Sequence, residues 1–520
     1  MIKYTLEKQL SAAIAIYLDR PDLDACLDVP NNTSYGDYST NVAFLLAKSL
    51  RFAPQKIAEM LCEKLAADPA FNDYLTFTPI NGFVNVRLSD RFLWSRLEAL
   101  FEKRDRFPSH DQSRTLLEYV SANPTGPLHV GHGRWAVLGD VMARILRFSG
   151  ADITREFYIN DAGNQIKNFY RSVDAARAGD PIPEDGYHGD YILELAKSYD
   201  DPIQVMLDRQ IQTLRRLDVE FDSWYSEKSL HNNGKVSQAL SLMKEKGLTY
   251  EQDGALWFAS SRFGDEKDRV LIKADGNLTY FAVDVAYHVD KIDRGFTRLL
   301  NIWGADHHGY VPRVRAALAG LFGDKFDTDQ GFHVLIGQLV SLFRNGEPVR
   351  MSKRTGEMVS LDEVIDEIGV DATRFFLIQK SADTQLDFDL ELASRKSSEN
   401  PVYYVQYAHA RMCSIVEKVG ILGPFNNLES LVLLPEERTL LLKALQIYDD
   451  VYDTALMLSP HRLVQYLTDL ARTFHNFYEA CPIMKATGPD KAKRLYLLLQ
   501  VREVFRLCFG LLGISAPEKM

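Results

Sequence analysis

Two histidines between a predicted strand and a predicted helix could bind phosphate groups. His129 and His132 follow the apolar run at residues 115–120 and precede a helical pattern of apolar residues that ends near Gly150. Backbone amides at a helix N-terminus attract anions, and two imidazoles at this spacing can face the same phosphate chain. Gly131 carries no side chain where a nucleotide would approach closely. Taken alone, the two histidines also fit a purely structural role.

A basic turn farther along the chain could neutralise negative charge on a departing phosphate group. It contains Arg350, Lys353 and Arg354, with Met351 and Ser352 between the first two cations. Cations placed where charge develops stabilise the transition state of phosphoryl chemistry. An ordinary exposed basic loop has the same composition, so this turn points to a function only when it is taken together with the histidines.

Together, the two stretches resemble the paired signatures of class I aminoacyl-tRNA synthetases, H-I-G-H and K-M-S-K-S, in the same order and between similar predicted elements. His129, Gly131 and His132 match the first, with valine in place of isoleucine. The second is matched by Met351, Ser352 and Lys353, flanked by arginines. The resemblance implies that these six residues bind ATP and that His129, His132 and Lys353 are catalytic. It also implies Mg²⁺ bound with the ATP, without a dedicated metal site.

Four further segments are similar to the arginyl-tRNA synthetases within this class, namely residues 118–124, 280–284, 303–309 and 400–411. This resemblance implies ATP-dependent activation of L-arginine to arginyl-adenylate. The arginyl group is then transferred to the 3′-terminal ribose of tRNA(Arg), with release of AMP and pyrophosphate. In this family an N-terminal domain contacts the tRNA elbow, a helical C-terminal domain reads the anticodon, and arginine activation usually needs bound tRNA.

The side chain of arginine is bound best by carboxylates and planar acceptors that match its forked guanidinium group. Tyr280 and Asp284 lie four residues apart on one face of a predicted helix and could supply such groups, although a buried ion pair or a surface aspartate would look the same. The resemblance implies that these two hold the guanidinium and that Glu118, Asn123 and His132 hold the ammonium and carboxylate ends. Where some relatives have a pocket glutamine we align His307, and we add it, with His308, to the arginine-binding candidates.

Tyr403, Tyr407 and Arg411 recur every four residues on the predicted helix at 401–419. Aromatic and guanidinium groups stack on unstacked bases, so these residues are candidates for contact with the tRNA anticodon. Packing in the domain core explains the same spacing equally well.

The elements around these residues predict three domains. We expect an α+β domain at 1–110 and a Rossmann-like α/β domain with a parallel sheet at 111–394, interrupted by a helical insertion at about 165–265. Its later strands are expected at 269–273, 299–303 and 333–336. The remainder, 395–520, is expected to be an all-α bundle with helices at 401–419, 436–458, 461–478 and 491–512.

Composition limits the alternatives. A chain of 520 residues is too long for one core, and 46% hydrophobic with 25% charged residues suits a globular enzyme. Five scattered cysteines without a C-x-x-C pair suit a reducing cytoplasm, and the absence of long apolar runs argues against membrane insertion. The net charge is −11, but residues 395–520 carry 15 Lys and Arg against 13 Asp and Glu, which is +2. We expect a cytoplasmic monomer that binds tRNA(Arg) and L-arginine.

Three other functions fit parts of the sequence. Residues 131–136 fit G-x-G-x-x-A, as in a dinucleotide-dependent oxidoreductase, but about ten residues separate this motif from the preceding strand and no convincing ribose-binding acid follows about 20 residues on. Asp306, His307 and His308 could belong to a metal-dependent phosphohydrolase, although its partner motifs are missing. A tRNA-binding paralogue without activity is the third, but the candidate residues for ATP and arginine are all present.

Overall fold

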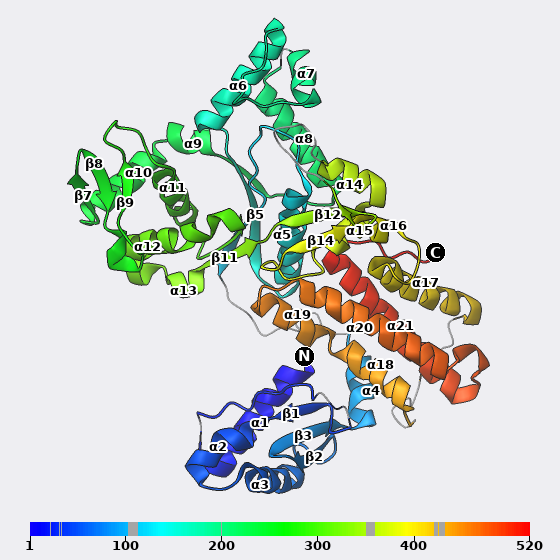
Figure 1. Cartoon of the computed structure of the whole chain (residues 1–520). Helices are drawn as coiled ribbons and strands as arrows, with labels where there is room; N and C mark the ends of the chain where they lie inside the picture. Colours follow the sequence, from blue (N-terminus) through cyan, green and yellow to red (C-terminus); the bar gives the residue numbers. More distant parts are fainter. Residues whose placement is uncertain are drawn as a thin grey trace.

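The central structure is a five-stranded parallel sheet of order β11-β10-β4-β5-β6, here in a computed structural model (Figure 1). Its strands are β4 (Arg114–Glu118), β5 (Asp152–Ile159), β6 (Ser223–Ser226), β10 (Arg298–Gly304) and β11 (Phe332–Gly337). Leu116 and Leu117 on the middle strand are fully buried, as expected for a strand covered on both faces. Because the strand order reverses beside β4, the ligand site is expected at the carboxyl ends of the strands near it. The predicted Rossmann-like α/β domain is confirmed.

The structure describes residues 1–520 except 21, 31, 33, 102–112, 199, 350–358, 421–424 and 426–431. Helix α5 (Val130–Phe148) connects β4 to β5, and α11 (Tyr280–Asp293) precedes β10. After β11, a small sheet of order β13-β12-β14 packs with three short helices. These elements are β12 (Val340–Arg344), β13 (Glu347–Pro348), α14 (Leu361–Ile368), α15 (Val370–Leu377), β14 (Leu386–Asp389) and α16 (Leu390–Ser394).

The N-terminal part is an α+β unit, as predicted. Its antiparallel sheet has the order β1-β3-β2, and its helices pack on one another and on the sheet. The elements are α1 (Ile2–Leu18), β1 (Tyr38–Thr40), α2 (Val42–Leu50), α3 (Pro54–Ala67), β2 (Leu75–Ile80), β3 (Phe83–Leu88) and α4 (Asp90–Glu98). This unit lies below the C-terminal helices in Figure 1.

The insertion is not wholly helical. It contains α6 (Gly163–Ala178), α7 (Asp190–Ala196), α8 (Pro202–Arg216), α9 (Glu227–Asn232) and α10 (Lys235–Glu245), but β6 lies among them and pairs with β5 in the central sheet. The strand predicted at 269–273 is present as β9 (Arg269–Ile272), but it joins β7 (Thr249–Gln252) and β8 (Ala255–Phe258) in a separate antiparallel sheet. The turn Asp253-Gly254, with both φ angles positive, closes the β7–β8 hairpin.

Between residues 390 and 520 the described part of the chain forms helices and no strand, as predicted. The bundle comprises α17 (Pro401–Val419), α18 (Pro435–Leu445), α19 (Ile447–Leu456), α20 (His461–Ala480) and α21 (Gly488–Leu512). The single helix predicted at 436–458 is wrong, because Gln446 ends α18 and begins α19. Gln446 has a φ of −72° and a ψ of −10°. The resulting change of direction is too small to disturb the apolar spacing from which one continuous helix was predicted.

Buried charges join the bundle to its neighbours. Arg374 on α15 is fully buried and donates to Asp140 on α5 at 2.6 Å and to the carbonyl of Leu512, at the end of α21, at 2.9 Å. On the other side, Arg438 on α18 makes two 2.7 Å hydrogen bonds to Asp37 of the N-terminal unit. The helix that carries the histidine pair is therefore fixed directly to the last helix of the chain.

Candidate active site

His129 and His132 form the N-terminal cap of α5, at the position predicted from the sequence. His129 Nδ1 accepts from the N–H groups of Gly131 at 3.1 Å and His132 at 3.4 Å, while His132 Nδ1 accepts from the N–H of His129 at 3.3 Å. The rings stack with centroids 3.7 Å apart. A neutral imidazole that accepts at Nδ1 carries its proton at Nε2. Each ring is thus held in the tautomer that donates a hydrogen bond from Nε2.

The two glycines of this helix start make room for packing. A Cβ at Gly131 would lie 3.0 Å from the ring of His129, and one at Gly133 would lie 2.6 Å from a methyl group of Leu361. A side chain at Gly133 would displace Leu361 of α14, and one at Gly131 would press on the ring of His129. The predicted contact of Gly131 with ATP stays a prediction.

The second signature lies outside the described residues, and so do Met351, Ser352 and Lys353, together with Arg350 and Arg354. The residues that follow it are described. Ser360 forms an antiparallel bridge with His129, and Leu361 N–H donates to the carbonyl of Leu128 at 2.8 Å. The chain therefore returns to the histidine pair at Ser360, immediately before α14.

A group of carboxylates lies at the same edge of the sheet, around Asp284 on α11. Burial, and then the nearby carboxylates of Glu118 and Glu227, raise the pKa of Asp284 to about 7, against the opposing effect of Lys291. Within the described part of the chain, the Asp284 carboxylate has no hydrogen bond or ion pair. Glu118 is paired with Lys291 at 2.6 Å, so the charge of Asp284 is the one left without a close cation, and acids crowded in this way suit a cationic ligand with several donors.

Glu227 was not predicted from the sequence. It begins α9, its exposed fraction is 7%, and burial raises the pKa of its carboxyl although Tyr158 and His231 oppose the rise. Tyr158 lies near all three acids. Burial raises the pKa of its hydroxyl, and the charges of Glu227, Asp284 and Glu118 add to this rise. The segment around Glu227 has the composition of an ordinary exposed helix start, so only its spatial neighbours identify it.

Glu118 and Asn123 lie on either side of a strained turn at the end of β4. Val120 has a φ of +68° and Ser121 one of +46°, which is unfavourable for a β-branched residue and is typical of functional sites. Ser121 Oγ donates to Glu118 Oε1 at 3.0 Å and accepts from the N–H of Tyr158 at 3.2 Å. The Asn123 amide donates to the side chain of Gln165 on α6. The turn thus ties β4, β5 and the insertion together at the site.

Tyr280 and His307 lie at the edge of the acidic group. Tyr280 begins α11 and is 66% exposed. His307 and His308 are exposed in the 3-10 turn η2 (Ala305–Tyr310), which follows β10, and His307 is 6.0 Å from the ring of Tyr310. Burial and then Asp284 raise the pKa of Tyr310. The structure thus places Tyr280 one helical turn before Asp284, and it places His307 beside Tyr310, a neighbour of Asp284 that the sequence did not indicate.

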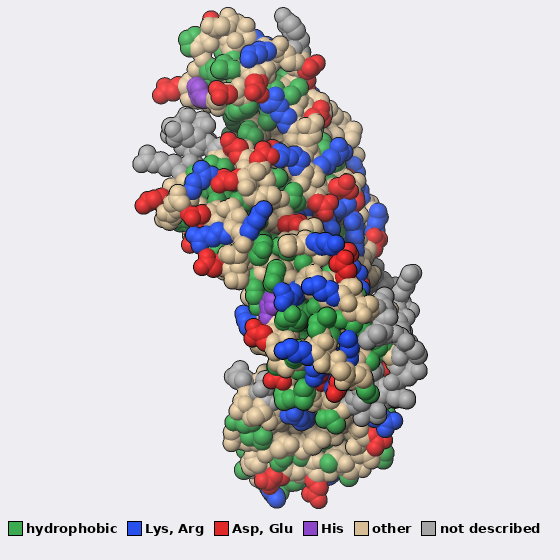
Figure 2. Space-filling view, turned by 90° about the vertical axis from the view of Figure 1, so that its right-hand side faces the viewer, with side chains coloured by type: hydrophobic (Ala, Val, Ile, Leu, Met, Phe, Trp, Pro, Cys, Tyr) green, Lys and Arg blue, Asp and Glu red, His purple; other side chains and the backbone are tan. Residues whose placement is uncertain are grey.

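The tyrosine stripe on α17 lies off the core. The buried face of this helix consists of Val402, Val405, Gln406, Ala408, His409, Ala410, Met412 and Ile415. Tyr403 and Tyr407 stack at 6.2 Å, and Arg411 donates to the hydroxyls of Tyr407 at 3.2 Å and Tyr478 at 2.8 Å. Packing in the core therefore does not explain the stripe. Figure 2 shows Lys and Arg side chains among hydrophobic ones on the side of the molecule where the bundle lies.

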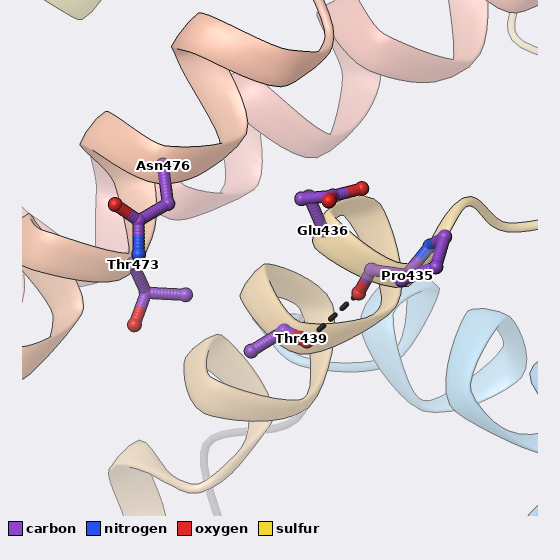
Figure 3. A pocket seen from close by; sticks show the side chains of 5 residues that line it. All are labelled: Pro435, Glu436, Thr439, Thr473 and Asn476. Carbon is purple, nitrogen blue, oxygen red and sulfur yellow. Dashed lines mark hydrogen bonds between the residues drawn. The ribbon is translucent and has the colours of Figure 1, made fainter.

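Two surface depressions lie away from these residues. One, of about 170 Å³, is between α18 and α20 and is lined by Pro435, Glu436, Thr439, Thr473 and Asn476 (Figure 3). The other, of about 440 Å³, is at the amino ends of the central strands, beside Phe296 and Gly331. Neither contains a residue predicted to bind arginine or ATP.

The described residues offer no group of three or more His, Cys, Asp or Glu side chains that could hold a metal ion. Asp306, His307 and His308 therefore gather no further ligands there, as a metal-dependent phosphohydrolase would need. Of the helices described, none has the length and apolar character to cross a membrane. Between β4 and α5 the chain runs from Glu118 to Val130, too long a connection for the tight glycine turn of a dinucleotide-binding fold.

Three family models match the chain in sequence. "Arginyl tRNA synthetase N terminal domain" matches residues 2–88, "tRNA synthetases class I (R), catalytic domain" matches residues 97–174 and 190–406, and "DALR anticodon binding domain" matches residues 405–520. Together they span nearly the whole chain.

Relatives of similar length agree with these matches. An arginine–tRNA ligase of Anoxybacillus flavithermus is 42% identical, over 99% of this chain and 97% of the relative. One of Desulfosudis oleivorans is 41% identical over the full length of both chains. Among solved structures, Thermus thermophilus arginyl-tRNA synthetase superposes with a TM-score of 0.83 at 25% identity over all of both chains. The chain therefore belongs to the arginyl-tRNA synthetases, within class I of the aminoacyl-tRNA synthetases.

Proposed function

We propose that the chain is an arginine–tRNA ligase that forms arginyl-adenylate from L-arginine and ATP and transfers the arginyl group to the 3′-terminal ribose of tRNA(Arg). The observation that carries this proposal is the acidic group around Asp284, at the edge of the sheet where the stacked imidazoles of His129 and His132 begin α5. A slot for a guanidinium beside a site for phosphates is what the first step requires. Besides the arginyl-tRNA, the products are pyrophosphate and AMP.

The chemistry rests on positioning and charge. The arginine carboxylate attacks the α-phosphorus of ATP, the bond to the β-phosphate oxygen breaks, and pyrophosphate leaves. His129 and His132 donate from Nε2 to phosphate oxygens, a direction fixed by their Nδ1 hydrogen bonds. Lys353 neutralises charge on the departing pyrophosphate. Mg²⁺ would be held mainly by the phosphates of ATP, since it keeps most of its own waters and needs few protein ligands.

The same proposal assigns the arginine-binding groups. Asp284 and Glu227 accept from the guanidinium, with Tyr280 and His307 at the edge of the slot. The ammonium and carboxylate ends are held by Glu118, Asn123 and His132. Met351, Ser352 and Gly131 complete the ATP site.

The tRNA contacts follow the division of the chain. We assign residues 1–110 to the tRNA elbow, 111–394 to catalysis and 395–520 to the anticodon, where Tyr403, Tyr407 and Arg411 stack on and contact bases. The stripe of these three side chains on the outer face of α17 supports this assignment. We propose a cytoplasmic monomer that activates arginine only when tRNA is bound.

Aminoacylation of total tRNA with each of the twenty amino acids tests the function. Incorporation of arginine alone is expected, and incorporation of lysine or glutamate would overturn the specificity. Pyrophosphate exchange with ATP and arginine, with and without tRNA, tests the dependence on tRNA. Rapid exchange without tRNA would contradict that part of the proposal. The Asp284→Asn variant is the control, since it should lose charging with arginine and gain none with other amino acids.

A further inference from the structure

Four polar residues form a row across four neighbouring strands of the central sheet. Asn301 on β10 pairs in register with Glu118 on β4, Glu118 with Glu156 on β5, and Glu156 with Ser223 on β6. Two glutamates thus lie side by side on neighbouring strands, both nearly or fully buried. Like charges directly opposite one another in a sheet are unfavourable, so each carboxylate needs a partner of its own.

Helix α11 supplies a separate cation for each glutamate. Arg294 makes two hydrogen bonds to Glu156, of 2.7 and 2.8 Å, and the hydroxyl of Tyr287 adds a third of 2.7 Å. Lys291 forms the ion pair with Glu118, with Nζ 2.6 Å from Glu118 Oε2. The two ion pairs have different surroundings, because Arg294 is partly exposed whereas Lys291 is fully buried.

The environment of Lys291 fixes the Glu118 carboxylate in one orientation. Lys291 Nζ also donates to Asn301 Oδ1 at 2.9 Å and lies 4.2 Å from the centre of the Tyr287 ring. The other oxygen of Glu118 accepts from Ser121 Oγ at 3.0 Å. Each carboxylate oxygen is therefore held by a different element, Oε2 by α11 and Oε1 by the strained turn after β4.

A buried lysine beside a site for a cationic amino acid is unfavourable for two reasons. Its desolvation is unfavourable, and its charge repels the incoming ammonium and guanidinium groups. Without it, however, Ser121 alone would hold the Glu118 carboxylate against the repulsion of Asp284, whose pKa Glu118 helps to raise. A charge retained against both costs indicates a role in the site.

We propose that Lys291 is a positioning residue of the arginine site, which holds Glu118 in the orientation that receives the α-ammonium group of arginine. This rests on the proposed function, in which Glu118 binds that group. Lys291 itself does not touch the substrate. Its effect reaches arginine through one oxygen of Glu118, so the binding of ATP is independent of it.

The test replaces Lys291 in the full chain and measures aminoacylation kinetics and thermal unfolding. Lys291→Met is expected to raise the KM for arginine about 10- to 100-fold, as for loss of a charged hydrogen bond, with the KM for ATP unchanged. Lys291→Arg should recover most of the affinity. Lys235→Met is the matched control, because it removes another lysine that pairs with an acid on α11, Asp290 at 3.2 Å. The control should keep the wild-type KM for arginine.

A double-mutant cycle with Glu118→Gln separates the possible outcomes. If Lys291 acts through Glu118, Lys291→Met should add little in the Glu118→Gln background. A normal arginine KM in Glu118→Gln alone would refute the role of Glu118 and the inference with it. A raised KM in Glu118→Gln but not in Lys291→Met would refute the inference only. If Lys291→Met changes the KM for arginine and the KM for ATP equally and lowers the unfolding temperature, Lys291 has only a structural role, which would refute the inference. If Lys291→Met does not fold, Lys291→Gln replaces it, and an arginine KM equal to that of Lys291→Arg would refute the inference.

Discussion

Ser360 pairs with His129 in an antiparallel bridge, although more than two hundred residues separate them in the sequence. The bridge joins the residues that follow the second signature to the start of the first. Movement of α14 would therefore be transmitted to the imidazole pair, and the contact of Leu361 with Gly133 reinforces this link.

Replacement of His129 can separate helix capping from phosphate binding. Asparagine is a preferred N-cap residue, so His129→Asn should keep the cap but lose the Nε2 donor. We expect kcat to fall about 10²–10³-fold with little change in stability. His129→Ala should lose the same activity and also about 1 kcal/mol of unfolding free energy. Wild-type kcat in the asparagine variant would mean that the imidazole only caps the helix.

Lys353 is expected to act on turnover rather than on arginine binding. Lys353→Ala should lower kcat about 10²–10³-fold, because one charge-stabilising donor is lost from the transition state. Pyrophosphate exchange in the presence of tRNA measures this step, and the KM for arginine should stay unchanged. Lys325→Ala, in the depression at the opposite edge of the sheet, is the control and should have normal kinetics. A raised arginine KM with normal kcat would contradict the proposed role of Lys353.

Asp284 should make arginine binding depend on pH. Its pKa of about 7 means that the carboxyl loses its charge as the pH falls below 7, so the KM for arginine should rise about 10-fold per pH unit there and level off above it. A KM that does not vary between pH 6 and 8 would refute this.

The same shift has a consequence for stability. A carboxyl group whose pKa is higher in the folded than in the unfolded protein lowers the free energy of unfolding at any pH at which it is ionised. For Asp284, this destabilisation is complete above pH 7 and disappears as the pH falls toward the pKa of the unfolded chain. Asp284→Asn should therefore raise the unfolding temperature of the ligand-free enzyme at pH 8 and remove the pH dependence of arginine binding. If Asp284→Asn were less stable than the wild type at pH 8, this would contradict the repulsion between Asp284 and the carboxylates of Glu118 and Glu227.

Glu227 should contribute to arginine affinity as strongly as Asp284. Glu227→Gln keeps the size of the side chain and loses its charge, so the KM for arginine should rise about 10- to 100-fold. Glu245→Gln, at the exposed end of α10, is the control and should leave the KM unchanged. Steady-state aminoacylation at saturating ATP and tRNA measures both variants. Equal kinetics in the two would remove Glu227 from the slot.

Tyr407 should affect tRNA and neither small substrate. Loss of one base stacked on an aromatic ring costs about 1–3 kcal/mol, so Tyr407→Ala should raise the KM for tRNA about 5- to 150-fold. The KM values for arginine and ATP should not change. Tyr250→Ala, another partly exposed tyrosine but on β7 of the insertion, is the control. A tRNA KM that is the same in both variants would argue against a base contact on α17.

Local signals in the sequence located much of the site but not its electrostatic partners. The histidine pair was predictable because strand, loop and helix start follow one another directly around it. Glu227 and Lys291 were not, since each acquires its role from acids on other elements, and neither has an unusual sequence context. β6 was hidden for a related reason. Its four residues are recognisable as a strand only because β5 lies beside them.

The backbone N–H groups of Ile2 and Lys3 donate to Asp449 Oδ2 at 3.2 Å, across almost the whole length of the chain. During synthesis, the first domain emerges and folds long before this partner exists. Its docking face must then stay exposed until α19 has left the ribosome. A nascent chain halted before α18, which carries the other partner Arg438, should therefore carry a folded but undocked first domain, and the contact between this domain and the helical bundle should form late.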